Sequence, residues 1–108
     1  MKGMHDIFME KVILGKTGIV ANKNGFGALP IQRITMDEAK YLLRKAADNG
    51  FNFFDTARNY TDSEEKIGES LSDIRSKIFI ATKTSALTAK DFWRDLETSL
   101  RNLRTDYI

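Results

Sequence analysis

The stretch FNFFDTARNY, residues 51–60, decides the fold of this chain. It begins with a phenylalanine-rich run, residues 51–54, in which only Asn52 is polar, and it ends at Asp55. A short apolar run of this kind is typical of a strand buried inside a parallel sheet. Because parallel strands are usually joined by helices, we expect a helix on either side of this stretch.

The segment before this strand has a complete helix pattern. Thr35 and Glu38 form a capping-box pair, whose hydroxyl and carboxylate should satisfy free backbone N–H groups. Asn49 and Gly50 end the helix, since glycine accepts the left-handed conformation that follows a helix end. The apolar side of this helix consists of Ala39, Leu42, Leu43, Ala46 and Ala47.

The segment after residue 60 continues the alternation of helix and strand. A second helix begins at Asp62 or Ser63 and has an acidic first turn, Glu64 and Glu65, which the helix dipole favours. A third strand, residues 78–82, ends at Lys83. The apolar side of the second helix is narrow and consists of Ile67, Leu71 and Ile74.

The remaining segments fit the same α/β architecture. A disordered leader at residues 1–8, a hairpin at 9–21 and a strand at 24–29 come before the first helix. A third helix opens near Thr88, and residues 107–108 begin a fourth strand. The apolar side of the third helix, which we expect to pack against the rest of the chain, is Phe92, Trp93, Leu96, Leu100 and Leu103.

The composition excludes several classes of protein. The 108 residues carry 17 Lys and Arg against 15 Asp and Glu, without the basic stripe of a nucleic-acid binder. Because the chain has no cysteine, it holds neither a disulfide scaffold nor a thiolate metal site, and we expect it in the cytoplasm. Its apolar runs, about four residues long, are too short to cross a membrane.

Three polar residues follow the predicted strands at the edge where parallel α/β folds place their chemistry. Asp55 ends one strand, Lys83 ends the next, and Tyr60 lies in the loop between them. A paired carboxylate keeps a lysine charged and oriented, and an ammonium group beside a phenol stabilises the phenolate. We therefore expect Tyr60 to protonate a carbonyl as hydride arrives, with Lys83 assisting and Asp55 holding Lys83.

Each of these residues also has a simpler interpretation. Lys83 can mark the point where a buried strand meets water, Asp55 can start an ordinary turn, and Tyr60 can be an exposed aromatic residue of a loop. Three strands with three helices would then form a self-contained three-layer α/β domain. Such a domain would bind a ligand or a partner without redox chemistry, and the residues alone leave both interpretations open.

Several segments taken together resemble the aldo/keto reductase family, from about residue 11 to residue 108. The most specific is the Asp-Thr-Ala stretch that leads to a tyrosine. The matching segments are LGKTG (14–18), GFGA (25–28), NFFDTARNY (52–60), SEEKIG (63–68), IATK (80–83) and LRNLRTDYI (100–108).

This resemblance implies a TIM (β/α)₈ barrel that reduces aldehydes or ketones with NADPH and without a metal. The chain would hold the N-terminal hairpin, which closes the bottom of the barrel, and about three strand–helix units. Asp55, Tyr60 and Lys83 would be catalytic. The backbone around Gly27, Ala28 and Leu29, together with Asp55, would contact the nicotinamide end of NADP(H).

The chain also departs from the family pattern. A full barrel takes about 250 residues, and the family's catalytic histidine follows the fourth strand, whereas the only histidine here is His5 in the predicted leader. We therefore expect an N-terminal fragment of a reductase that is inactive by itself. Its open sheet would leave unpaired strand edges, through which we expect it to associate.

Overall fold

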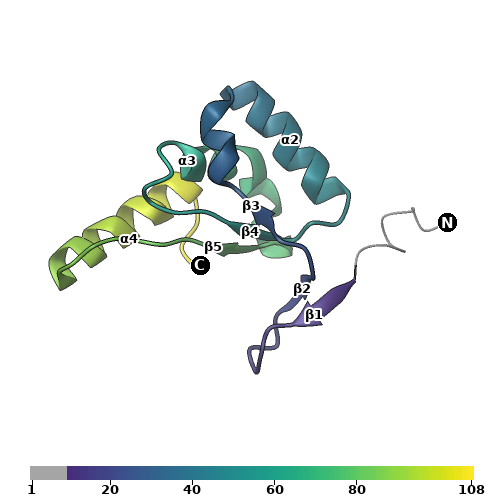
Figure 1. Ribbon diagram of the computed structural model, residues 1–108, viewed down its shortest axis with the longest axis horizontal. Helices are drawn as coiled ribbons and strands as arrows, with labels where there is room; N and C mark the ends of the chain where they lie inside the picture. Colours follow the sequence, from purple (N-terminus) through teal and green to yellow (C-terminus); the bar gives the residue numbers. More distant parts are fainter. Residues whose placement is uncertain (1–9) are drawn as a thin grey trace.

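The computed structural model describes residues 10–108 (Figure 1). A hairpin comes first and three strand–helix units follow. The predicted leader, residues 1–8, and residue 9 of the predicted hairpin lie outside the described part of the chain. The elements are β1 Lys11–Ile13, β2 Val20–Asn22, β3 Phe26–Gly27, η1 Leu29–Arg33, α2 Met36–Asp48, β4 Phe53–Asp55, α3 Ser63–Leu71, η2 Ser72–Lys77, β5 Phe79–Ala81 and α4 Ala89–Leu103.

The three strands after the hairpin form a parallel sheet in the order β3-β4-β5. Phe54 lies at its centre, opposite Phe26 on one side and Ile80 on the other. The predicted α/β fold with a parallel sheet is therefore confirmed. Within residues 10–108, no helix is both long enough and apolar enough to cross a membrane.

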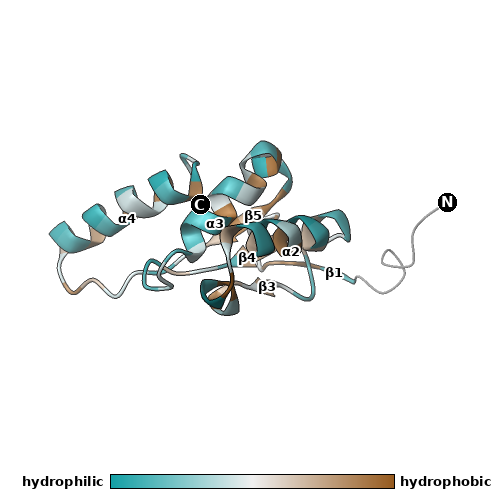
Figure 2. Cartoon of the chain, turned by 90° about the horizontal axis from the view of Figure 1, so that it is seen from above, coloured by the Kyte–Doolittle hydropathy of each residue, from teal (hydrophilic) through white to brown (hydrophobic). Residues whose placement is uncertain are grey.

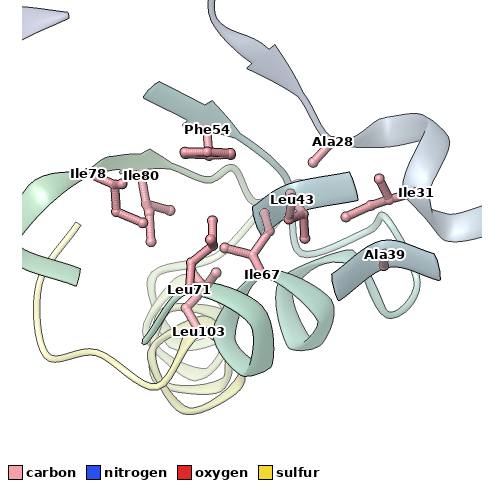
Figure 3. Packing of buried hydrophobic residues seen from close by; sticks show 10 residues of the cluster. All are labelled: Ala28, Ile31, Ala39, Leu43, Phe54, Ile67, Leu71, Ile78, Ile80 and Leu103. Carbon is pink, nitrogen blue, oxygen red and sulfur yellow. The ribbon is translucent and has the colours of Figure 1, made fainter. Parts of the chain in front are cut away.

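The hydrophobic core lies between the sheet and the helices α2, α3 and α4 (Figure 3). Figure 1 shows α2 and α3 on one side of the strands, and Figure 2 shows that the outer surfaces of the helices are largely hydrophilic. Phe54 is completely buried, and burying a side chain of this size contributes about 1.5–3 kcal/mol. The buried cluster consists of Ala28, Ile31, Ala39, Leu43, Phe54, Ile67, Leu71, Ile78, Ile80 and Leu103.

The other face of the sheet has no helix against it in the described part of the chain. Side chains alternate along a strand, so Phe53, Asp55 and Phe79 point away from the buried Phe54 and Ile80. The chain is thus built in two layers. The three-layer arrangement that the sequence left open is not found among residues 10–108.

The hairpin is attached at the amino ends of the strands, away from the predicted site. The backbone N–H of Asn22 donates to Oδ1 of Asn52 at 2.8 Å, and Nδ2 of Asn52 donates to the carbonyl of Val20 at 3.1 Å. Asn52 comes directly before β4. The hairpin is therefore held at the amino end of β4.

The first helix begins at the predicted cap, but its capping box differs in one detail. The N–H of Glu38 donates to the Thr35 hydroxyl at 3.1 Å, as predicted. The Glu38 carboxylate accepts a hydrogen bond from the same hydroxyl, at 3.1 Å, instead of one from a backbone N–H group. The carboxylate therefore orients the capping hydroxyl rather than satisfying a second backbone donor.

Two predicted elements are shorter in the structure. The strand expected at residues 24–29 is only β3, because Leu29 already begins the 3-10 helix η1, whose first turn holds Pro30. The second helix ends at Leu71, so that Ile74 lies in η2 with a non-helical backbone. Ile74 still packs against the core from this position.

The packing predicted for the start of the third helix is wrong. Phe92 is 44% exposed and Trp93 is 60% exposed, and their rings contact each other edge-to-face with centroids 5.5 Å apart. The reason is that the first turns of α4 extend beyond the sheet (Figure 1). Only the far end of this apolar side, at Leu103, is buried in the core.

The fourth strand predicted at residues 107–108 is not formed. Arg75 holds this segment instead: its Nη2 donates to the carbonyl of Tyr107 at 2.7 Å, and its guanidinium lies 3.8 Å from the centre of the Tyr107 ring. Burial lowers the pKa of Arg75 from its ordinary value. The backbone of Tyr107 is thus engaged with a side chain and not with the edge strand β5.

Candidate active site

The structure brings Asp55 and Lys83 together at the carboxyl ends of β4 and β5. Nζ of Lys83 lies 3.0 Å from each carboxylate oxygen of Asp55 and donates to the carbonyl of Thr56 at 2.6 Å. The two side chains are about half exposed, 44% for Asp55 and 50% for Lys83. Water therefore reaches the pair, and a ligand could reach it as well.

Tyr60 lies beside this ion pair. Its ring centre is 5.3 Å from Nζ of Lys83. The loop that carries it is closed by two backbone hydrogen bonds, from the N–H of Tyr60 to the carbonyl of Ala57 at 3.1 Å and from the N–H of Ser63 to the carbonyl of Tyr60 at 2.8 Å. The three predicted catalytic residues thus lie at one place, while their catalytic roles stay predictions.

The predicted cofactor residues differ in what they expose. The N–H of Ala28 donates to the carbonyl of Asp55 at 2.9 Å, its own carbonyl accepts from the Ser63 hydroxyl at 3.1 Å, and its side chain is fully buried. Gly27 is exposed, and a Cβ added to it would meet no atom within 4 Å. Leu29 is 43% exposed. Gly27 and Leu29 therefore supply the surface that a cofactor can approach.

A cavity of about 160 Å³ lies between the end of β5 and α4. It is lined partly by Lys83 and Asp95, but neither Asp55 nor Tyr60 contributes to its lining. For this reason we do not assign the reacting carbonyl to it. Among residues 10–108, no group of three or more acidic or histidine side chains could hold a metal ion.

Sequence reasoning missed two buried charged residues of α3. Nζ of Lys66 donates hydrogen bonds to the carbonyls of Ile31 and Ile34, at 2.9 and 2.7 Å. It also donates to Oδ1 of Asp62 at 2.9 Å. This last hydrogen bond holds the pKa of the Asp62 carboxyl below its ordinary value. The spacing of Asp62 and Lys66, one helical turn apart, was the signal available in the sequence.

The second missed residue is Glu64, which is 1% exposed. Its carboxylate accepts hydrogen bonds from Arg58, from Thr82 and from Asn102. Sequence reasoning placed Glu64 in an acidic first turn, where a carboxylate normally faces water. The structure places it inside, between the loop that carries Tyr60 and the end of β5.

The structure has a parallel sheet with helices on one face, and an Asp–Lys pair lies beside a tyrosine at the carboxyl edge of this sheet. This is the arrangement expected of part of an α/β barrel with a polar site at the strand ends. The sequence pattern of the aldo/keto reductase family matches residues 21–108, and the chain belongs to this family. The family resemblance found in the sequence is therefore confirmed.

Related proteins agree with this placement. The chain is 33% identical over 110 residues to L-galactose dehydrogenase from Arabidopsis thaliana, a match that covers 88% of this chain and 34% of that protein. A candidate aldo-keto reductase from Pseudomonas aeruginosa superimposes with a TM-score of 0.84 at 32% identity, covering 97% of this chain and 46% of the other. For the holo form of an aldo-keto reductase from Bacillus halodurans, the TM-score is 0.82 at 26% identity, with 93% and 38% covered.

The chain thus spans about a third of the length of L-galactose dehydrogenase and less than half of each of these two solved chains. Over that length it has their fold, which confirms the predicted N-terminal part of a TIM barrel.

Proposed function

We propose that the protein to which this chain belongs is a cytoplasmic oxidoreductase that reduces an aldehyde or ketone with NADPH. Tyr60 acts as the general acid, Lys83 assists it, and Asp55 holds Lys83. The observation that carries this proposal is the position of Nζ of Lys83, which lies 3.0 Å from both carboxylate oxygens of Asp55 and 5.3 Å from the centre of the Tyr60 ring.

This arrangement suits proton donation to a carbonyl oxygen. NADPH, when bound, supplies the hydride that reaches the carbonyl carbon. The Tyr60 hydroxyl gives its proton to the carbonyl oxygen, and the Lys83 ammonium group stabilises the negative charge that forms on Tyr60. The Asp55 carboxylate and the Thr56 carbonyl fix the ammonium group in place, which reduces the reorganisation needed during the reaction.

The end of β3 fits a flat ring placed against the sheet. Gly27 pairs with Asp55 in the register of β3 and β4, and no atom lies above it within 4 Å of an added Cβ. Leu29 offers an exposed apolar side chain two residues further on. We propose that these residues, the chain around Ala28 and Asp55 receive the nicotinamide end of NADP(H).

An assay of the protein as its gene encodes it tests this function. We expect oxidation of NADPH, followed by absorbance, when benzaldehyde or an aliphatic ketone is added. We expect no turnover by the 108-residue chain alone, because residues 10–108 contain no histidine to orient the carbonyl and span only a third of a curated relative. NADPH oxidation that does not depend on an added carbonyl compound would contradict the proposal. The absence of NADPH oxidation with every carbonyl compound tried would contradict it as well.

For the 108-residue chain alone, we also propose association through the sheet edges. Within residues 10–108, β3 and β5 each pair with β4 only, so one edge of each strand has no partner strand there. Unpaired edges are templates for pairing with another chain. Sedimentation velocity should show dimers or larger species whose share rises with concentration, and a compact monomer at all concentrations would refute the proposal.

A further inference from the structure

Glu64 is a buried carboxylate that the proposed chemistry does not use. It lies in the first turn of α3 and is 1% exposed. Oε2 accepts a hydrogen bond from the Thr82 hydroxyl at 2.7 Å, and Oε1 accepts from the Arg58 guanidinium and, at 3.4 Å, from Nδ2 of Asn102. Because a buried charge is costly unless it is paired and hydrogen-bonded, its three partners determine where it can lie.

Two of these partners, Thr82 and Arg58, are linked to the backbone of Lys83. Thr82 comes directly before Lys83, and the Thr82 hydroxyl donates a hydrogen bond to Glu64. The backbone N–H of Arg58 donates to the carbonyl of Lys83 at 2.9 Å, while the Arg58 side chain is paired with Glu64. Glu64 therefore holds the backbone from which the Lys83 side chain extends.

The same ion pair holds the turn that carries Tyr60. Nη2 of Arg58 donates to the carbonyl of Thr61 at 3.4 Å. The Arg58 side chain therefore links the residue two positions before Tyr60 to the residue directly after it. Thr61 has a φ of 42°, in the left-handed region that a β-branched residue rarely adopts. Such a conformation persists only where the surrounding contacts impose it.

We propose that Glu64 is a positioning residue that, through Arg58 and Thr82, sets the separation between the Tyr60 hydroxyl and the Lys83 ammonium group. The hydrogen bonds of Glu64 go to Arg58, Thr82 and Asn102 and not to Tyr60 or Lys83, so it acts by placing their backbones. This inference rests on the proposed carbonyl reduction, because the separation matters when the two groups share a proton-donating role. Its structural part, the local order of the two segments, can be measured without that reaction.

The test compares Glu64→Gln with the original protein as its gene encodes it. Glutamine has nearly the same shape but no charge to hold Arg58. We expect kcat for benzaldehyde to fall about tenfold with KM within about twofold, because small displacements of reacting groups reduce kcat more than ground-state binding. Hydrogen exchange should become about tenfold faster at the Arg58 and Tyr60 amides and stay unchanged at Leu43, in the core of α2.

Glu65→Gln is the matched control, since Glu65 lies in the same helical turn, carries the same charge and is exposed. It should leave kcat and exchange unchanged. The double variant combines Glu64→Gln with Arg58→Met and leaves no unpaired charge in the interior. Its loss in kcat should therefore be smaller than the sum of the losses of the two single variants. If Glu64→Gln does not fold, Thr82→Val removes one donor and keeps the ion pair, and we expect the same pattern with a smaller loss.

The outcomes separate this inference from the proposed function. If the original protein reduces no carbonyl, the proposed function fails, and the exchange at Arg58 and Tyr60 alone decides whether Glu64 orders the two segments. Unchanged exchange in Glu64→Gln would overturn the inference whether or not the protein is a reductase. Equal acceleration at Leu43 would overturn it too, because Glu64 would then stabilise the whole fold and not this site.

Discussion

Replacing Gly68 with alanine should lower the free energy of unfolding by about 3 kcal/mol or more, at the upper end of what overpacking costs. Gly68 lies on α3 where this helix meets the end of α4. A Cβ at this position would overlap the carbonyl oxygen of Asn102 and lie 2.9 Å from the carbonyl carbon and 3.0 Å from Cα of Leu103. All three are backbone atoms, so no rotation of a side chain can relieve the overlap.

The two helices would have to move apart, and Leu103 would leave the core. The better helix propensity of alanine, worth about 1 kcal/mol, does not offset this loss. Urea unfolding followed by circular dichroism gives the measurement. Gly27→Ala is the matched control, because its added Cβ meets no atom within 4 Å. Equal midpoints for the Gly68→Ala variant and the original chain would show that α3 and α4 do not pack as described.

The sequence predicted those parts of the fold that depend on local patterns. Thr35, Asn49 and Thr88 mark helix ends through their own backbone and side-chain hydrogen bonds, and the structure places helix boundaries next to all three. The apolar periodicity of α4 is equally clear in the sequence, yet Phe92 and Trp93 are exposed. Periodicity shows which residues share a face, but not whether another element covers that face.

The residues of the candidate site likewise fall into those that the sequence predicts and those that it does not. Asp55, Tyr60 and Lys83 could be found because the carboxyl ends of neighbouring parallel strands meet at one edge, whatever their distance in the sequence. Glu64 could not be found, because its burial depends on Thr82, which directly follows β5, and on Asn102 of α4. A glutamate in the first turn of a helix is ordinarily solvated, and nothing local distinguishes Glu64 from the exposed Glu65.

Replacing Tyr60 with phenylalanine should lower kcat for carbonyl reduction by about a hundredfold or more, the usual contribution of a general acid. The substitution removes only the hydroxyl, which has no hydrogen-bond partner among residues 10–108, so no buried group loses a partner. The ring that remains can still lie 5.3 Å from Nζ of Lys83. We therefore expect the melting temperature and the KM for NADPH to stay close to those of the original protein.

Tyr41→Phe supplies the matched control, because Tyr41 is 68% exposed on α2 and is not one of the residues at the strand ends. It removes the same atom and should leave kcat unchanged. If Tyr60→Phe kept the original rate, the proton would come from another group, and the Asp55–Lys83 pair would need a different role. If instead kcat fell while the pair of variants melted at the same temperature, the loss would belong to the chemistry, since the single missing atom is the one that carries the proton.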